Sequence, residues 1–108
     1  MSTVCLKLYC TEKQRHKDQL LYEWLLEEAQ TIGIEGSSVY RSIAGYGRHG
    51  IRHDESFFEL AGDLPIQVEF VLDKTLADKL IKQLQIEQLD LFYVQYPVTS
   101  GYLSDKTD

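Results

Sequence analysis

The sequence predicts an α+β domain in which four strands and two helices follow one another in the order βαββαβ. Four segments show the residue pattern of strands, and two helical stripes of apolar residues separate the first strand from the second and the third from the fourth. At 108 residues with 44% hydrophobic content, the chain is long enough for one domain and too short for two. We expect a single domain over residues 1–96 and a polar C-terminal tail over residues 97–108.

The first strand and first helix follow each other near the N-terminus. Apolar and other residues alternate over residues 3–10, a period of two that is typical of a strand with one buried face. Asp18 is a candidate N-cap for a helix, and Gly33 is placed to end it. The apolar residues between them recur every three or four positions, as one helix face requires: Leu21, Leu25, Ala29 and Ile32.

The remaining elements come in the order strand, strand, helix, strand. Residues 38–44 and 64–72 are rich in β-branched and aromatic residues, which favours the second and third strands. Asp73 or Thr75 can cap a second helix whose buried stripe runs from Leu76 to Leu84. Residues 89–96 then predict a fourth strand, which Pro97 ends.

This order is the ferredoxin-like arrangement, in which both helices cover one face of a four-stranded antiparallel sheet. The other face is left without helices. It is expected to mix polar and apolar residues from the first and third strands: Cys5, Lys7, Tyr9, Gln67, Glu69 and Val71. Such a face is too apolar for solvent and too polar for a core, which suits contact with another subunit. We therefore expect a homo-oligomer.

Composition argues against several classes of protein. The net charge of -6 repels phosphate backbones, so we expect no nucleic-acid partner. No apolar run approaches the ~20 residues that cross a bilayer, and the N-terminus does not show the pattern of a signal peptide, which predicts a cytoplasmic protein. The sequence lacks a Gly-x-Ser-x-Gly elbow, a Walker loop, a paired-cysteine metal signature and a helical His-Glu-x-x-His. We expect neither enzymatic activity nor a cofactor.

Cys5 and Cys10 lie five positions apart on the first strand. This spacing separates them by roughly 16 Å and directs them to opposite faces. They can neither form a disulfide with each other nor chelate one metal ion. We expect two buried or half-buried free thiols.

A basic, glycine-rich stretch lies between the second and third strands. From Gly36 to His53 the acidic chain has no Asp or Glu. Glycines there can expose backbone N–H groups toward an anion, while arginines bind phosphate or carboxylate through two parallel hydrogen bonds. Histidines add a charge that depends on pH. The candidate ligand-binding residues are Gly45, Tyr46, Gly47, Arg48, His49, Arg52 and His53.

Other interpretations of this stretch stay open. A solvated loop would need the same glycines for turns and the same arginines for solubility. A metal site would combine His49, His53 and Asp54 in a helical turn, although neighbouring arginines oppose a divalent cation. Arg41 lies within the second strand, where an ion pair with Glu69 is more favourable than ligand contact.

A second basic cluster precedes the first helix. Its residues are Lys13, Arg15, His16 and Lys17. Most such clusters are solvated surface, but in the predicted fold this turn reaches the end of the sheet and can form a second wall of the ligand site. Trp24, Tyr22 and Leu26 on the first helix are expected to be packing residues.

Three blocks, LYEWLLEEAQTIGIEG, VYRSIAGYG and DLPIQVEFV, resemble the corresponding blocks of a PII-like family, domain of unknown function 190. The resemblance covers roughly residues 3–96. It implies a homotrimer with the uncovered sheet faces turned toward the threefold axis. In nitrogen-regulatory PII proteins, which this family resembles in fold, the loop between strands two and three contacts target proteins, and adenine nucleotides bind between subunits. The resemblance also implies a membrane transporter or channel as the class of target.

The chain departs from true PII proteins at two places. Their phosphate-binding run of glycines and a lysine is replaced by KQLQIEQLD, and Tyr46 does not stand in the context of their uridylylated tyrosine. A cysteine motif of a related copper-tolerance family is also missing. We therefore expect a PII-like regulatory protein that binds a small anionic metabolite or nucleotide and presents residues 45–63 to a target. The alternatives are a metal-binding oligomer using His49 and His53, and a structural adaptor trimer without a ligand.

Overall fold

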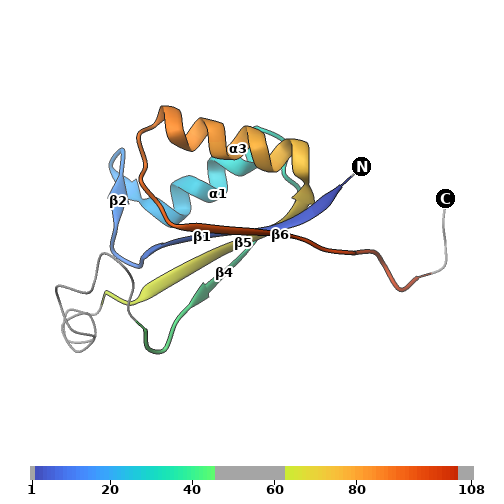
Figure 1. The fold of residues 1–108 in the computed structure, drawn as a ribbon. Coiled ribbons are helices and arrows are strands. Elements are labelled where there is room, and N and C mark those ends of the chain that lie inside the picture. Colours follow the sequence, from blue (N-terminus) through green and yellow to red (C-terminus); the bar gives the residue numbers. More distant parts are fainter. Residues whose placement is uncertain (1, 46–62, 105–108) are drawn as a thin grey trace.

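The structure, a computed structural model, describes residues 2–45 and 63–104. Its main sheet has the antiparallel strand order β4-β5-β1-β6, and two helices, α1 and α3, lie on one face of it (Figure 1). The strands are β1 (Thr3–Thr11), β4 (Ser38–Arg41), β5 (Pro65–Asp73) and β6 (Tyr93–Pro97), and the helices are α1 (Leu21–Thr31) and α3 (Lys74–Ile86). The predicted α+β fold with four antiparallel strands and helices on one face is confirmed.

The core lies between the sheet and the helices. Strands β1 and β5 pair along their full length, from Thr3 opposite Asp73 to Thr11 opposite Pro65. Every second residue of both strands faces the helices and is buried: Val4, Leu6, Leu8, Cys10, Ile66, Val68, Phe70 and Leu72. Each such apolar side chain contributes about 1.5–3 kcal/mol on burial, so this alternation holds the two layers together.

Helix α1 begins later in the chain than its predicted cap implies. Leu20 is the N-cap and makes no side-chain capping hydrogen bond, so the prediction for Asp18 is wrong. Instead, β2 (Arg15–His16) and β3 (Gln19–Leu20) form a hairpin, and its turn residues Lys17 and Asp18 have φ angles of 52° and 66°. Positive φ at both turn positions matches the twist of a two-residue hairpin, a geometry that aspartate tolerates.

Gly33 ends α1, as predicted. Its φ is +100°, a left-handed conformation that glycine adopts without steric cost. The backbone N–H of Gly33 donates to the carbonyl of Gln30 at 3.1 Å, and that of Ile34 donates to Ala29 at 2.9 Å. These bonds satisfy the last carbonyl groups of the helix.

Two predicted strand boundaries differ by several residues from the structure. Strand β4 ends at Arg41 rather than at residue 44. Strand β6 begins at Tyr93 rather than at residue 89. Leu89 and Leu91 pack against the core from the connection between α3 and β6, so burial without strand pairing produced the apolar pattern there. Asp73 is the N-cap of α3 but makes no side-chain capping bond.

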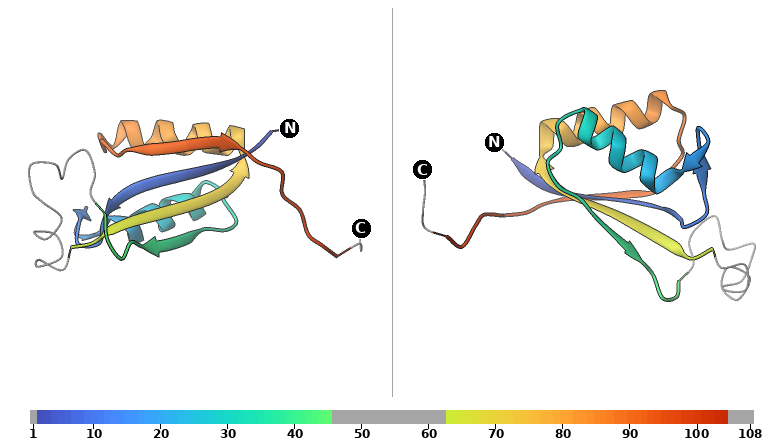
Figure 2. Two further views of the ribbon diagram at one scale, coloured as in Figure 1. Left: turned by 60° about the horizontal axis from the view of Figure 1, so that its bottom comes forward. Right: turned by 180° about the vertical axis from the view of Figure 1, so that it is seen from behind.

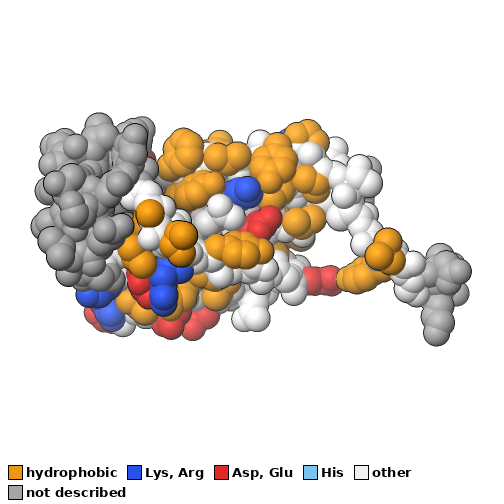
Figure 3. Space-filling view, turned by 90° about the horizontal axis from the view of Figure 1, so that it is seen from below, with side chains coloured by type: hydrophobic (Ala, Val, Ile, Leu, Met, Phe, Trp, Pro, Cys, Tyr) orange, Lys and Arg blue, Asp and Glu red, His pale blue; other side chains and the backbone are white. Residues whose placement is uncertain are grey.

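The sheet face opposite the helices is uncovered within this chain (Figure 2). The register places its side chains in rows, with Tyr40, Gln67 and Tyr9 in one row and Val71, Cys5 and Tyr96 in another. Tyr40 is 51% exposed, Val71 49% and Tyr96 39%. The space-filling view shows this largely hydrophobic face, with basic and acidic side chains near its middle (Figure 3).

After Pro97 the chain leaves the sheet. The N–H of Val98 donates to the carbonyl of Thr3 at 3.1 Å, and the following residues run away from the domain (Figure 1). Tyr102 and Leu103 are fully exposed there. In the parts of the chain that the structure describes, no helix has both the length and the apolar character needed to span a membrane.

Candidate functional site

Three segments that are distant in sequence meet at one end of the sheet. They are residues 11–20 after β1, the residues that flank the segment 46–62, and the start of the connection from α3 to β6 (Figure 1). The backbone N–H of Glu12 donates to the carbonyl of Leu64 at 2.8 Å, and that of Lys13 donates to Asp63 Oδ1 at 2.7 Å. The turn after β1 is therefore fixed beside the base of the predicted ligand-binding loop.

Arg41 adds a second link at this end of the sheet. Its guanidinium donates to Glu12 Oε2 at 2.8 Å, so the predicted ion pair with Glu69 is wrong. The register explains the difference, because Arg41 lies opposite Ile66 and its side chain is on the same face as the core. Glu69 lies on the other face, opposite Ser38. A shift of one residue in the pairing register moves a side chain to the other face of the sheet, and residue pattern alone does not resolve the register.

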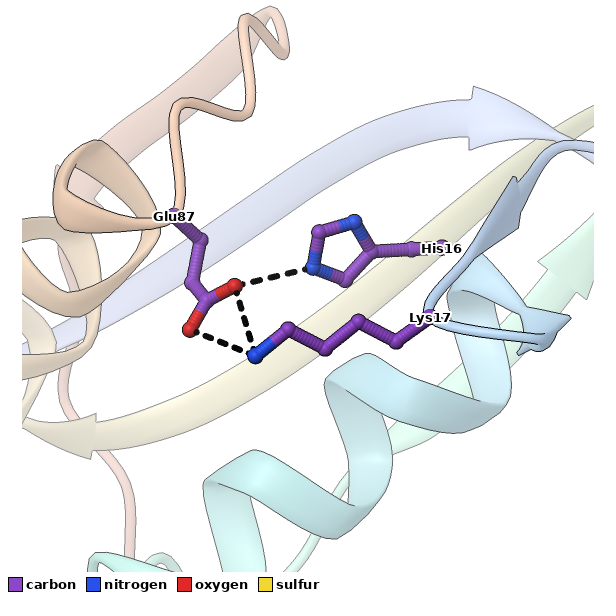
Figure 4. A network of polar contacts seen from close by, with 3 residues as sticks. All are labelled: His16, Lys17 and Glu87. Atoms are coloured by element: carbon purple, nitrogen blue, oxygen red, sulfur yellow. Dashed lines mark hydrogen bonds and ion pairs between the residues drawn. The ribbon is translucent and has the colours of Figure 1, made fainter.

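A network of polar contacts joins the hairpin to the end of α3 (Figure 4). His16 Nε2 lies 3.0 Å from Glu87 Oε1, and the ammonium of Lys17 lies 3.1 Å from both oxygens of that carboxylate. The side chains of His16 and Glu87 are each only 16% exposed. Hydrogen bonds from Lys17, and then from His16, lower the pKa of Glu87. The carboxylate thus stays charged and holds the hairpin against α3.

Trp24 supports this network from α1. The rings of His16 and Trp24 meet edge to face with centroids 4.6 Å apart, and Trp24 is buried in the core. The prediction that Trp24, Tyr22 and Leu26 are packing residues is confirmed, because the last two also pack against the core. The position of His16 is therefore set by packing against Trp24 on one side and by its polar contact with Glu87 on the other.

Of the predicted ligand-binding residues, the structure describes Gly45. Its φ is +156°, which L side chains rarely adopt, and a Cβ there would lie 3.9 Å from Pro65 Cγ. Tyr46, Gly47, Arg48, His49, Arg52 and His53 lie outside the described residues. Their convergence on an anion stays a prediction, as does the alternative metal site of His49, His53 and Asp54.

The second basic cluster does lie next to the base of this loop. The acidic partners that fix it there, Glu12, Asp63 and Glu87, were not predicted from the sequence. These contacts span between 29 and 71 positions in the chain. No local pattern indicates them, because each depends on how the sheet and helices pack.

The two cysteines are free and buried, as predicted. Burial and, to a smaller extent, the nearby carboxylate of Asp63 raise the pKa of Cys10 to about 12. The thiolate is the reactive form of cysteine, so Cys10 is poorly suited to act as a nucleophile. Among the described residues, no group of three or more His, Cys, Asp or Glu side chains is arranged to hold a metal ion.

A groove of about 440 Å³ lies between α1 and the residues that follow it. Its lining combines apolar residues with three glutamates: Leu26, Ala29, Ile34, Glu23, Glu27 and Glu35. The glutamates repel a negatively charged ligand. This groove is therefore a poor anion site, and the end of the sheet near Gly45 is the better candidate.

Comparisons with known sequences identify the family of this chain. Residues 3–89 match the family DUF190, described as uncharacterised. A UPF0166 protein of Aquifex aeolicus (strain VF5) is 29% identical over 80 residues, which cover 74% of this chain and 76% of the relative. A UPF0166 protein of Methanocaldococcus jannaschii is 33% identical over 66 residues, covering 61% of this chain and 60% of the relative.

Solved structures with the same fold include PII-like proteins. CPII, a nitrogen regulatory PII-like protein from Thiomonas intermedia K12 bound to ADP, AMP and bicarbonate, has a TM-score of 0.51 at 16% identity, over 92% of this chain and 97% of CPII. A Thermus thermophilus protein described as a PII-like signalling protein has a TM-score of 0.53 at 22% identity, over 91% of this chain and 90% of that protein. The chain therefore belongs to the DUF190 family and has a PII-like fold.

Proposed function

We propose that this protein is a trimeric PII-like regulator that binds a small anionic metabolite, with adenine nucleotides as the first candidates, in clefts between subunits. The observation that supports this function is that the basic turn after β1 lies beside the base of the glycine-rich segment: the backbone N–H of Lys13 donates to Asp63, which precedes β5, and Gly45 follows β4. CPII, which has a similar fold, has been solved with ADP, AMP and bicarbonate. These anions are therefore the first ligands to test.

Electrostatics assigns the main contacts to the arginines of the loop. Arg41 and Lys17 already pair with Glu12 and Glu87, so an anion that used them would first have to displace a carboxylate. We propose that the guanidinium groups of Arg48 and Arg52 each donate two hydrogen bonds to the anion, and that backbone N–H groups around Gly45 and Gly47 donate further ones. The turn over residues 13–17 forms the second wall.

Ligand binding is proposed to order the segment 45–63 and so change the surface that a target protein meets. Arg48 and Arg52 neutralise the ligand, the glycines allow its close approach, and His49 and His53 strengthen binding as the pH falls. A membrane transporter or channel is the class of target that the family resemblance implies. The protein acts in this proposal by binding, without catalysis.

The phosphate-binding mode of true PII proteins is not part of this proposal. The segment KQLQIEQLD, residues 82–90, forms the last turns of α3 and the residues after it, where Glu87 is tied to the hairpin. A carboxylate at this place disfavours a phosphate. The phosphate contacts are therefore assigned to the segment that begins at Gly45.

A thermal-shift panel on the purified protein tests the ligand. The panel contains ADP, AMP, ATP, bicarbonate, inorganic phosphate, carboxylates and divalent metals. A ligand at a hundred times its dissociation constant stabilises the protein by about 2.7 kcal/mol, which gives a measurable rise in melting temperature. We expect adenine nucleotides to raise it, and Arg48→Ala with Arg52→Ala to remove the rise. Lys82→Ala, which removes an exposed cation on α3, is the matched control.

The other outcomes identify the competing functions. A shift with divalent metals alone, lost on changing His49 and His53, would indicate a metal-binding oligomer. No shift with any ligand would indicate a structural adaptor. Light scattering during size-exclusion chromatography tests the oligomer separately, and a mass three times the 12.5 kDa of one chain is expected.

A further inference from the structure

Two opposite charges lie side by side on the uncovered face of the sheet. Lys7 of β1 and Glu69 of β5 are direct partners in the antiparallel register. The neighbouring rows on the same face carry mainly aromatic, aliphatic and uncharged polar side chains: Tyr40, Gln67 and Tyr9 on one side, and Val71, Cys5 and Tyr96 on the other. The two charges thus lie between two rows that carry no charge.

Although they are register partners, the two charged groups do not pair with each other. The ammonium of Lys7 lies 5.5 Å from the centroid of the Tyr96 ring, on β6. The carboxylate of Glu69 accepts a hydrogen bond from Cys5 Sγ at 3.4 Å. Across residues 2–45 and 63–104, no carboxylate forms an ion pair with Lys7 and no cation forms one with Glu69. Both charges therefore lack an ion-pair partner within the described chain.

A second copy of this chain supplies the missing partners. Covering the apolar rows removes water from the face, and an unpaired charge in a dry contact is strongly unfavourable. A copy of the chain brings one Glu69 for each Lys7 and one Lys7 for each Glu69. Charge complementarity on a self-associating face thus favours a second copy over an unrelated partner.

We propose that Lys7 of one subunit pairs with Glu69 of the next across the sheet-to-sheet contact, and that this pair selects the chain's own copies as partners. This inference rests on the oligomer of the proposed function and adds the residues that determine its specificity. Tyr96 also raises the pKa of Lys7, which keeps its ammonium charged. The hydrophobic rows provide most of the buried area of the contact. The two charges disfavour any partner that places a like charge opposite them.

Charge reversal tests the pair. Lys7→Glu sets a new carboxylate against Glu69 at every contact, and Glu69→Lys sets a new ammonium against Lys7. Each variant should therefore dissociate at least ~10-fold more readily than the wild type. The double variant Lys7→Glu/Glu69→Lys restores opposite charges and should regain the wild-type oligomer. The measurement is light scattering over a concentration series. Lys82→Glu, a reversal at an exposed site on α3, is the control that should leave the oligomer unchanged.

Mixing the two single variants separates pairing between chains from pairing within one chain. The new carboxylate of one variant meets the new ammonium of the other only across a contact between subunits, so mixing should recover oligomer if the pair joins chains. In a ring of three, at most two of three contacts match, so recovery is partial. A pair within one chain would give no recovery, which would overturn the inference.

Two further results distinguish a failure of the proposed pair from a failure of the proposed oligomer. A wild-type protein that is monomeric would defeat the oligomer of the proposed function, and this inference with it. A wild-type oligomer whose stability is unchanged by either reversal would defeat this inference alone. Far-UV circular dichroism checks that each variant is folded. Lys7→Gln and Glu69→Gln, which remove a charge without reversing it, replace any unfolded variant, and each should weaken the oligomer.

Discussion

At the scale of single residues, the contacts that fix the candidate site are carboxylates paired over long distances in sequence. Glu12 holds Arg41, Asp63 accepts from the backbone of Lys13, and Glu87 holds His16 and Lys17. Each pair is partly exposed to water, which limits the contribution of any one of them to stability. Together they determine where the hairpin and the loop base lie relative to each other.

Glu87 should make the stability of the domain depend on pH in acid. Its pKa is lower in the folded protein than the ordinary value of about 4.3, so its stabilising contribution is complete above that value and is lost as the pH falls through the folded pKa. Glu87→Gln removes this contribution. We expect a lower melting temperature than the wild type at pH 7 and a difference that shrinks below about pH 4.

Asp78→Asn is the control for this prediction, since Asp78 forms an exposed ion pair with Lys74 on α3. Melting curves at several pH values should show a much smaller effect for this variant. A difference between Glu87→Gln and the wild type that grows toward low pH would contradict the lowered pKa.

Both thiols should be unreactive in the native protein. Cys5 and Cys10 are buried, and the raised pKa of Cys10, about 12, keeps it protonated at pH 8. A chromogenic disulfide reagent at pH 8 should label neither residue in buffer and both in guanidinium chloride. Rapid labelling of Cys10 without denaturant would show that its environment is more open than the structure indicates.

At the scale of elements, the two helices and the central strands are held by one apolar interface. Strand β1 pairs with both β5 and β6, and the helices cover the same side of all three (Figure 2). The hairpin β2–β3 then brings the basic cluster to the end of α3 through Glu87. The elements that position the site are therefore held in place by packing in the core, away from the site itself.

Helix α3 offers a matched test of its buried face. Leu80 is 0% exposed and Ile86 is 64% exposed on the same helix. Leu80→Ala should lower the free energy of unfolding by about 2–5 kcal/mol, because it removes apolar contacts and leaves a cavity. Ile86→Ala should change it by less than about 0.5 kcal/mol. Urea unfolding measures both, and equal effects would mean that α3 packs on a different face.

At the scale of the whole molecule, the uncovered sheet face is the feature that a single chain leaves unexplained. Val71, Tyr40 and Tyr96 are substantially exposed there, and the opposite face is fully used by the core. The apolar character of this face supports the proposed contact between copies of the chain.

Val71→Glu should weaken the oligomer without unfolding the subunit. The substitution adds a charge to the apolar rows of the proposed contact, where no cation is assigned to it. Light scattering should show a shift toward the mass of a single chain at micromolar concentration. Ile86→Glu, at an exposed apolar site on the helix layer, should not cause this shift. Equal behaviour of the two variants would place the contact elsewhere.

Sequence pattern predicted most of the fold, because alternation and helical periodicity record which residues face the core. The pattern failed at Asp18, which belongs to a hairpin turn, and at Leu89 and Leu91, which are partly buried outside any strand. It also assigned Arg41 to Glu69, since the side of the sheet depends on the register. For the candidate site, the sequence indicated the basic residues and missed the carboxylates that position the turn.

The sequence by itself determined the order of the main-sheet strands and the two helices, the buried stripes and the basic character of residues 36–53, since these depend on local residue pattern and composition. Tertiary structure alone decided that Glu12 meets Arg41, that Glu87 meets His16 and Lys17, and that Lys7 lies directly opposite Glu69 without pairing with it. Those facts depend on register and packing between distant segments. Long-range contacts of this kind leave no periodic signal in the chain, because they join positions whose separation is set by the fold.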